Sequence, residues 1–455
     1  MTPALAALAH PTLRHVDMDI VRSQWLALAP PYDVENWVIP LPVWATRRYD
    51  DGGESAWARL RADLSIDAAP SRPMCVYVHV PFCSSKCGFC DCYSFALSPE
   101  HASLKRTYVD RVTNEVRLWA AQGDVASRPV STVHLGGGTP TYLGPELLTD
   151  LTAACRMHLG TSTQTEWALE STVESLTPDV IETMNGLGYD RLHVGVQSLD
   201  DEVRESIGRR RPVREVLNTL EGTLELGWTV SVDMVCGLPG QTLSSFAADI
   251  ETLIGFGIDG VSLYELLIYP QNRRWAAQMG LNGRSHFPNY VMFHVGAALL
   301  EASGYRKNTF NHWANERDDN RYFTFPIRDE DCLALGTIAD GMFGDYHFRH
   351  PKFANYLRSA GPESPGLEGG LRRTAYESAI RPVTTAILSG RIPPELVDHL
   401  RRRTDDVAVV ERWTELGLVA GRDDGGLHLL TNGSWFAGNM LQELTGLYPE
   451  HTLQR

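Results

Sequence analysis

The sequence predicts an α/β fold, an open partial barrel of six strand–helix units, (β/α)6, followed by a small C-terminal winged-helix-like domain. Short β-rich apolar runs alternate with longer helical segments from Cys75 onward, and near the C-terminus two helical stretches lead into a hairpin and a last helix. Strands and helices that alternate at this spacing form βαβ units around a parallel sheet. Six units are too few to close an eight-stranded barrel, so we expect the curved sheet to stay open.

The six expected strands are apolar runs that each end in glycine or in polar and acidic residues. They lie at residues 75–80, 131–138, 165–172, 189–198, 229–237 and 259–266. Between them, segments such as 178–188 and 213–227 carry apolar residues at helical spacing. Right-handed crossovers place the C-terminal ends of all strands at one rim, where the sites of α/β folds are built.

The chain changes its rhythm along its 455 residues, which are too many for one average domain. We therefore expect an N-terminal extension (1–73), the barrel (74–300), a bridging region (301–370) and a helical, winged-helix-like domain (371–455). The extension is rich in Pro, Trp and Tyr and carries a short helix near residues 55–64. We expect it to pack on the barrel or to cover a site.

The C-terminal region has the order helix, helix, hairpin, helix, and the run DDGG at 423–426 supplies the hairpin turn. A winged helix can bind DNA, but this segment lacks a basic face, which favours a packing or lid role. The formal net charge of −15 also argues against a nucleic-acid partner or an anionic membrane surface.

The chain has no apolar run of about eighteen residues, and no basic segment precedes a long apolar stretch near its start. We therefore expect no membrane span, no signal peptide and a cytoplasmic location. Five of the eight cysteines lie between Cys75 and Cys92. In a cytoplasmic protein such clustering indicates metal or redox chemistry rather than disulfides.

Cys83, Cys87 and Cys90 stand in a C-x3-C-x2-C spacing on the loop directly after the first expected strand. Three thiolates on one short loop can bind three irons of a [4Fe–4S] cluster and leave one iron without a protein ligand. The amino and carboxylate groups of S-adenosylmethionine (SAM) can chelate that iron. An electron from the cluster then breaks the sulfonium C–S bond and gives a 5′-deoxyadenosyl radical, while the protein orients the cofactors.

A zinc-binding loop is the alternative, with Cys92 as a fourth ligand, but structural zinc usually takes two separated ligand pairs. The cluster is favoured because the cysteine triad opens a βαβ series and because acidic and polar residues recur at later strand ends. In addition, the three glycines of HLGGGTPT (134–141) let the backbone approach a ligand closely.

These motifs closely resemble the radical SAM family that includes oxygen-independent coproporphyrinogen III oxidase. The resemblance runs from about Ser55 to the C-terminus and rests on YVHVPFC, CGFCDC, GGGTPTYL, GYDRLHVGVQS, DMVCGLPGQT and LGLV with LTNG. It implies a radical SAM barrel in which two SAM molecules sit side by side.

The resemblance also implies which residues hold each SAM. The SAM bound to the cluster would be held by Tyr77, Gly137, Glu170 and Asp340. The second SAM would be held by Phe89, Gly138, Thr139, Gln197, Arg209, Asp233 and Leu267. Cys92 matches a fourth cysteine that lies beside the SAM site and does not bind iron.

Three functional groups share this resemblance. Porphyrinogen oxidases decarboxylate the propionates of coproporphyrinogen III, and haem chaperones are non-enzymatic haem-binding proteins. The third group contains the class C radical SAM methyltransferases and cyclopropanases of natural-product pathways. There, the deoxyadenosyl radical abstracts hydrogen from the methyl of the second SAM, and the methylene radical adds to an sp2 carbon.

Departures from the porphyrinogen oxidase pattern favour the third group. They are LPVWATRRYDD at 41–51 and the run from Tyr264 to Leu267 after the sixth strand; the CDCYSF run at 90–95 also looks like the methyltransferase group. We therefore expect C-methylation or cyclopropanation of a heteroaromatic natural product. Decarboxylation of coproporphyrinogen III or a related tetrapyrrole, and haem binding by a chaperone, are the alternatives.

The candidate catalytic residues are Cys92, beside the SAM site, and Tyr264, Glu265 and His312 on the substrate side. Glu265 or His312 could take the proton that a radical adduct must lose, although each could equally be a polar packing group. The expected partners are a small-molecule substrate and an electron donor such as flavodoxin or ferredoxin.

Overall fold

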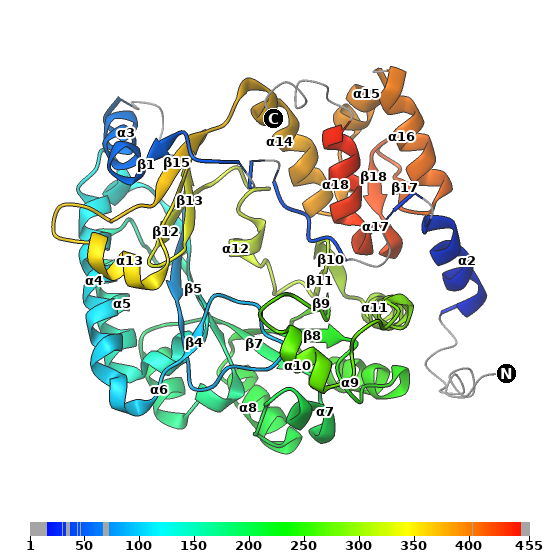
Figure 1. The fold of residues 1–455 in the computed structure, drawn as a ribbon, viewed down its shortest axis with the longest axis horizontal. Helices are drawn as coiled ribbons and strands as arrows, with labels where there is room; N and C mark the ends of the chain where they lie inside the picture. Colours follow the sequence, from blue (N-terminus) through cyan, green and yellow to red (C-terminus); the bar gives the residue numbers. More distant parts are fainter. Residues whose placement is uncertain are drawn as a thin grey trace.

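The computed structural model describes residues 16–29, 31–32, 37–42, 44–45, 47–66, 72–402 and 404–446 (Figure 1). Within this part of the chain no helix is long and apolar enough to cross a membrane. The expectation of no signal peptide concerns mainly the first residues, most of which lie outside the described part.

All six predicted strands are present, and they run parallel at the centre of a thirteen-stranded sheet. In order across the sheet they are β2 (Met74–Val80), β5 (Val130–Gly137), β6 (Glu166–Ser171), β7 (Arg191–Gln197), β8 (Thr229–Cys236) and β9 (Gly260–Glu265). Nearly every residue of β2 is buried, as expected for a strand covered on both faces. The predicted α/β fold with a parallel sheet is therefore confirmed.

A seventh parallel strand, β12 (Asp331–Leu335), pairs with β2 on the side away from β5. The sheet then continues in antiparallel fashion on both sides, so its two edges do not meet and the barrel stays open. Beyond β12 lie β13 (Asp340–Phe343), β14 (Tyr346–Arg349), β15 (Gly369–Arg372) and β1 (Asp51–Gly52). Beyond β9 lie β11 (His312–Ala314) and β10 (Arg306–Thr309).

Helices cover the outer face of the curved sheet (Figure 1). They are α4 (Ala102–Ala120), α5 (Pro145–His158), α6 (Pro178–Gly186), α7 (Asp201–Ser206), α8 (Val213–Glu225), α9 (Leu243–Phe256) and α11 (Phe287–Ala302). Each buries a stripe of apolar residues at helical spacing, for example Tyr108, Val112 and Trp119 on α4. The short helix α12 (Arg321–Thr324) instead lies on the inner side, where the Tyr322 ring stacks on Tyr77 with ring centroids 4.8 Å apart.

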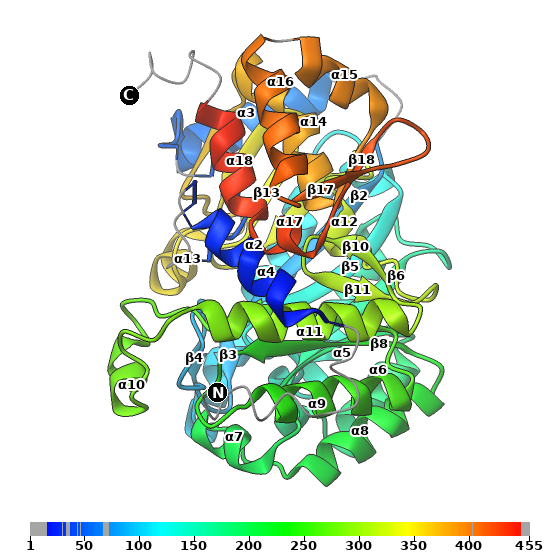
Figure 2. The ribbon, with the colours of Figure 1, turned by 90° about the vertical axis from the view of Figure 1, so that its right-hand side faces the viewer.

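The C-terminal region has the predicted winged-helix-like order around a small sheet, β16-β18-β17. Its elements are α14 (Ala375–Leu388), β16 (Arg391–Ile392), α15 (Pro394–Arg402), α16 (Thr404–Glu415), β17 (Val419–Gly421), β18 (Leu427–Leu429), α17 (Thr431–Trp435) and α18 (Ala437–Gly446). The expected DDGG turn joins β17 to β18. This region packs beside α11 (Figure 2).

The N-terminal residues contact both the barrel and the C-terminal region. Helix α2 (Met18–Leu28) places Trp25 against Tyr290 of α11 and Phe436, with ring centroids 4.8 and 6.4 Å away. Helix α3 (Gly53–Ile66), predicted near residues 55–64, packs Trp57 edge-on against Trp119 of α4.

Candidate active site

The three spaced cysteines lie on a loop at the C-terminal rim of the parallel sheet. Strand β3 (Phe82–Cys83) follows β2 almost directly and pairs with β4 (Phe95–Ala96), so the intervening residues form a closed loop. The Gly88 N–H donates to the Ile207 carbonyl at 3.2 Å, which ties the loop to the segment after β7. The sequence predicted that the cysteine loop follows the first strand, and the structure places it there.

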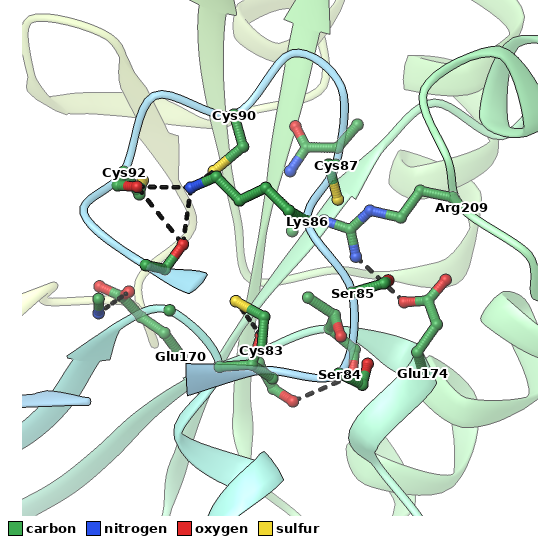
Figure 3. A pocket seen from close by; sticks show the side chains of 18 of the residues that line it. Cys83, Ser84, Ser85, Lys86, Cys87, Cys90, Cys92, Glu170, Glu174 and Arg209 are labelled. Carbon is green, nitrogen blue, oxygen red and sulfur yellow. Dashed lines mark hydrogen bonds and ion pairs between the residues drawn. The ribbon is translucent and has the colours of Figure 1, made fainter. Parts of the chain in front are cut away.

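A cavity lies between this loop and the strand ends (Figure 3). Its walls are residues of the loop 83–94, the Gly137–Thr139 end of β5, and residues at or after the ends of β6, β7 and β8. Strand ends from four neighbouring units therefore converge on one site, as expected for the C-terminal rim of a barrel.

The thiols of Cys83, Cys87 and Cys90 project from the loop toward the same space, with Lys86 lying among them (Figure 3). In the described part of the chain no three His, Cys, Asp or Glu side chains lie close enough to share one metal ion. Three thiolates on one loop can each bind a different iron of a cluster.

Lys86 organises the loop around these cysteines. Its Nζ donates to the Cys92 carbonyl at 2.6 Å and to Ser94 Oγ at 2.8 Å, and it lies 3.5 Å from Cys90 Sγ. A hydrogen bond with Cys92 and the charge of Lys86 lower the pKa of Cys90 to about 6, despite burial. Burial raises the pKa of Cys87, against the opposing charge of Arg209.

The glycines at the end of β5 leave bare backbone beside the thiols. Gly137 has φ +104°, and a Cβ there would lie 2.5 Å from the His79 ring. A Cβ on Gly138 would lie 2.7 Å from the Phe82 carbonyl oxygen. Any side chain at these two positions would force the backbone to move, so the rim can pass close to a ligand only because both are glycine.

Glu170, the fifth residue of β6, is an anion held in place by two donors. Its Oε1 lies 3.0 Å from His134 Nε2, and its Oε2 accepts from the Gly137 N–H at 3.0 Å. Burial alone would raise its pKa, but His134 and the backbone donor outweigh burial and lower that pKa to about 2. The cavity therefore contains a fixed negative charge.

Two further charged pairs face the cavity from the next strands. Asp233 Oδ1 lies 2.6 Å from His193 Nε2, and this carboxylate outweighs burial to raise the pKa of His193. Arg209 Nη1 donates to Glu174 Oε2 at 3.0 Å. Burial would lower the pKa of Arg209, but Cys87 and Glu174 raise it.

The structure brings most of the predicted SAM residues to this cavity. The predicted residues that line it are Cys83, Cys87, Phe89, Cys90, Cys92, Gly137, Gly138, Thr139, Glu170, Gln197, Arg209 and Asp233. Gln197 has φ +73°, which is unusual for a residue other than glycine, and its side-chain amide lies over the Cβ-free face of Gly195.

Three predicted SAM residues are placed elsewhere. Tyr77 lies beneath Glu170 and stacks on Tyr322, outside the cavity wall. Leu267 lies beyond β9, and its carbonyl accepts from Asn272. Asp340 lines a different cavity, where its Oδ1 lies 2.7 Å from Arg349 Nε.

The candidate substrate-side residues do not line the cavity either. Glu265 is buried and lies 2.5 Å from His286 Nδ1 and 2.9 Å from Asn289 Nδ2. His312 uses both ring nitrogens, one with Ser262 and one with Asp318. Tyr264 is partly buried and lies edge-on to Trp37, with ring centroids 6.4 Å apart. These contacts favour the packing interpretation of the three residues.

Sequence reasoning missed Lys86, Glu174 and Asn272. Asn272, just before α10 (Arg273–Gln278), is buried, and its Nδ2 donates to the Phe89 and Leu267 carbonyls at 2.9 Å each. It therefore joins the cysteine loop to the segment after β9. Lys86 lies inside the C-x3-C spacing and could have been noticed, whereas nothing in the sequence pairs Asn272 with Phe89.

Comparison with known proteins identifies the family. The radical SAM superfamily matches residues 77–253, from β2 into α9. Residues 77–253 therefore form a radical SAM domain. The predicted cofactors, a [4Fe–4S] cluster and SAM, are thereby confirmed.

Relatives place the chain near oxygen-independent coproporphyrinogen III oxidase. It is 26% identical over 395 residues to anaerobilin synthase of Escherichia coli O157:H7, covering 85% of this chain and 86% of that protein. It is 27% identical over 356 residues to the oxygen-independent coproporphyrinogen III oxidase of Escherichia coli K12, covering 74% and 76%. A heme chaperone, HemW, of Mycobacterium tuberculosis is 31% identical over 200 residues, 44% of this chain and 51% of that one.

The fold agrees with these relatives. The solved structure of coproporphyrinogen III oxidase (HemN) from Escherichia coli superposes with a TM-score of 0.75 at 23% identity, covering 92% of this chain and 97% of that one. This likeness confirms the partial radical SAM barrel.

The prediction of a methyltransferase or cyclopropanase in natural-product biosynthesis is wrong. The relatives that align with most of the chain are an anaerobilin synthase and coproporphyrinogen oxidases. The prediction rested partly on the run from Tyr264 to Leu267, yet in the structure Glu265 and Leu266 are buried. Substitutions at packed positions say little about a substrate.

Proposed function

We propose that the protein is a radical SAM enzyme that oxidatively decarboxylates a propionate side chain of coproporphyrinogen III or a related tetrapyrrole. The observation that carries the proposal is the alignment of most of the chain with an anaerobilin synthase and with oxygen-independent coproporphyrinogen III oxidases. The cysteine-lined cavity at the strand ends supports it, because it offers the groups that a cluster and SAM require.

In this proposal Cys83, Cys87 and Cys90 would hold the cluster and would leave one iron without a ligand from the chain, where SAM could bind. When bound, the cluster and SAM supply a 5′-deoxyadenosyl radical, which takes a hydrogen atom from the substrate. Lys86 orders the loop and favours the thiolate at Cys90. The hydrogen leaves with 5′-deoxyadenosine, CO2 leaves the propionate, and one electron passes to an acceptor.

Fixed charges of the chain orient SAM. Glu170, held anionic by His134 and the Gly137 N–H, is placed to accept hydrogen bonds from the ribose hydroxyls or the ammonium of the cluster-bound SAM. Tyr77 supports Glu170 from below. Asp340 faces another cavity, so the proposal gives it no role.

A second SAM molecule occupies the same cavity in this proposal. Its site is formed by Phe89, Gly138, Thr139, Gln197, Arg209 and Asp233, with Leu267 behind the wall. Arg209 is placed to pair with the carboxylate of that SAM, and Asp233, held by His193, with its hydroxyl or ammonium groups. Cys92 lies at the cavity edge and serves as a neighbour of the site, not as an iron ligand.

The partners in the proposal are the tetrapyrrole, an electron donor such as flavodoxin or ferredoxin, and an electron acceptor. We keep a cytoplasmic location as a prediction. A haem chaperone is the second candidate function, since a HemW protein aligns with part of the chain. Such a chaperone would bind haem without turning over a porphyrinogen.

The test is anaerobic turnover of the cluster-reconstituted protein with reductant, SAM and coproporphyrinogen III, followed by mass spectrometry. We expect a product that has lost CO2 and two hydrogens from a propionate, together with 5′-deoxyadenosine. The Cys83→Ala variant should make neither, and Cys155→Ala, a buried cysteine of α5, should make both. Stoichiometric haem uptake without any product would reject decarboxylation and favour the chaperone.

A further inference from the structure

A second cavity lies on the inner side of the extended sheet, away from the cysteine loop. It has a volume of about 410 Å³, within the range of about 300–1,000 Å³ that small-molecule sites occupy. It is lined by described residues between Leu41 and Tyr49, by β13 and β14, and by α14. We call it the Arg381 cavity, after the arginine that lines it from α14. Apart from Asp340, no predicted site residue lines it.

The Arg381 cavity is lined by three arginines and a histidine among mainly apolar residues. Arg47, Arg349, Arg381 and His347 face it, and Asp340 is the one acidic residue among the lining residues that the structure describes. Asp340 is already paired with Arg349. The walls therefore carry more positive than negative charge.

Arg47 is also paired with carboxylates outside the cavity lining, because its guanidinium contacts Glu377 and Asp50. Arg381 is only partly paired. Its Nη1 donates to Asp329 at 3.1 Å, while its buried Nη2 has no hydrogen-bond partner among the residues that the structure describes. A buried donor without a partner is unfavourable, and more so when it is charged.

A second guanidinium stands directly behind the wall. Arg373 donates from Nη1 to His347 Nε2 at 2.9 Å and from Nη2 to the Gly344 carbonyl, while its buried Nε has no partner in the described part of the chain. No described carboxylate lies within ion-pair distance of Arg373. An anion in this cavity would therefore compensate charge that the protein itself leaves unbalanced.

The hydrogen bond from Arg373 to His347 leaves Nδ1 of the His347 ring as a hydrogen-bond donor. Because Nε2 accepts the Arg373 hydrogen bond, the single ring proton lies on Nδ1. Burial and the charges of Arg373, Arg381 and Arg47 lower the pKa of His347 to about 3, so the ring stays neutral. Nδ1 has no hydrogen-bond partner among the described residues and can donate to a ligand.

An aromatic surface adjoins these donors. The Trp44 ring lies 4.9 Å from the His347 ring and 5.3 Å from the Arg373 guanidinium carbon. Phe325 and Phe348 line other parts of the cavity. Donors for a carboxylate beside aromatic rings suit an acid that carries a flat, unsaturated ring.

Packed side chains, most of them aromatic, lie between the Arg381 cavity and Glu170 of the cysteine-lined cavity. Phe325 and Met342 line the Arg381 cavity, and they belong to the same packed cluster as Tyr77 and Tyr322. On the other side, Tyr77 adjoins Glu170: a Cβ on Gly136 would lie 2.9 Å from Tyr77 Cε2 and 2.8 Å from Glu170 Oε1. The lining of the Arg381 cavity is therefore connected through packed side chains to Glu170 of the cysteine-lined cavity.

We propose that the Arg381 cavity binds a carboxylate-bearing side chain of the substrate, with Arg381 and His347 as donors and Trp44 against the adjoining ring. The proposal rests on the proposed function, in which the substrate is a tetrapyrrole with several propionates. One propionate is then anchored in the Arg381 cavity while another is presented to the radical.

The test measures anaerobic binding of coproporphyrin III, the stable oxidised form of the porphyrinogen, to the reconstituted protein by fluorescence titration. Arg381→Gln should raise the Kd about tenfold or more, equivalent to about 1.4 kcal/mol. His347→Gln should weaken binding in the same direction. The matched control Arg358→Gln, at an exposed position of α13 (Phe353–Ser359), should bind like the wild type.

The tetramethyl ester of coproporphyrin III, which has no carboxylate, shows whether the arginine acts through the acid. We expect the ester to bind wild type and Arg381→Gln equally. Equal affinity of both proteins for the free acid, with both folded by circular dichroism, would overturn the proposal. Arg381-dependent binding of the acid without any decarboxylation in turnover would keep the site and reject the proposed function. Decarboxylation in turnover, together with unchanged affinity of Arg381→Gln for coproporphyrin III, would support the proposed function and reject the Arg381 cavity as a binding site.

Discussion

At the scale of single residues, the cavity is defined by charges that the protein fixes before any ligand arrives. Glu170, Asp233 and Arg209 each have a partner within 3.0 Å, and each partner comes from a different segment of the chain. Such preorganised groups bind a polar ligand without first having to reorient. The positions of these side chains should therefore matter more for ligand binding than the number of charged groups in the cavity.

Glu170→Gln tests this idea because it keeps the shape of the side chain and removes its charge. We expect SAM to bind about tenfold more weakly to the reconstituted variant, since a charge-assisted hydrogen bond is lost. Because the pKa of Glu170 is about 2, the carboxylate is charged at every usable pH, and the loss should not depend on pH. Equilibrium dialysis with labelled SAM at several pH values measures the SAM affinity of the variant and of the wild type.

The control for this experiment is Glu182→Gln, an exposed position of α6, which should bind SAM like the wild type. The lowered pKa also has a consequence for stability. It means that Glu170 stabilises the fold above about pH 4.5 and that this contribution is lost as the pH falls toward 2. A loss of SAM affinity in Glu170→Gln that disappears above neutral pH would contradict the fixed charge.

At the scale of elements, the cysteine loop is held by contacts with neighbouring segments rather than by regular structure of its own. Asn272 is the main link, since it donates to the Phe89 and Leu267 carbonyls and accepts from the Tyr269 N–H at 2.8 Å. Asn272→Ala leaves these partly buried groups without this partner, which costs about 1 kcal/mol. We expect a lower melting temperature and a cluster that is lost faster during gel filtration.

Iron content per chain, measured before and after gel filtration, checks this expectation. Asn282→Ala, at an exposed position in the connection to α11, is the matched control and should keep its iron. Equal iron retention in both variants would show that the loop is ordered without Asn272.

The elements also show how far sequence reasoning extends. The six barrel strands could be predicted because apolar runs alternate with helical segments, whereas Glu170 and Asp233 were assigned through the family resemblance. Strand β12 could not, since its five residues follow irregular chain and it is recognised only by its pairing with β2. Glu265 and His312 were proposed as proton acceptors. Their packing role could not be predicted, because their partners His286 and Asp318 are not adjacent to them in sequence.

At the scale of the whole molecule, the N-terminal segment joins the barrel to the C-terminal region. Trp37 is 6% exposed, donates to the Trp435 carbonyl at 2.9 Å, and lies near Phe310 and Tyr264. Trp37→Ala removes a buried ring and should destabilise the protein by about 3–5 kcal/mol. Thermal unfolding should therefore shift to lower temperature by several degrees.

Leu41→Ala, in the same segment but 58% exposed, is the control and should melt like the wild type. If Trp37→Ala melts like Leu41→Ala, the segment does not contribute to the cohesion of the molecule.

We propose that the molecule as a whole generates a radical from SAM and uses it on a tetrapyrrole propionate. The most direct measurement is anaerobic turnover with coproporphyrinogen III deuterated along its propionate chains, followed by mass spectrometry of 5′-deoxyadenosine. Our account predicts one deuterium in 5′-deoxyadenosine and loss of CO2 from the labelled chain. Unlabelled 5′-deoxyadenosine with intact coproporphyrinogen, in a preparation that contains its full cluster and cleaves SAM, would contradict it.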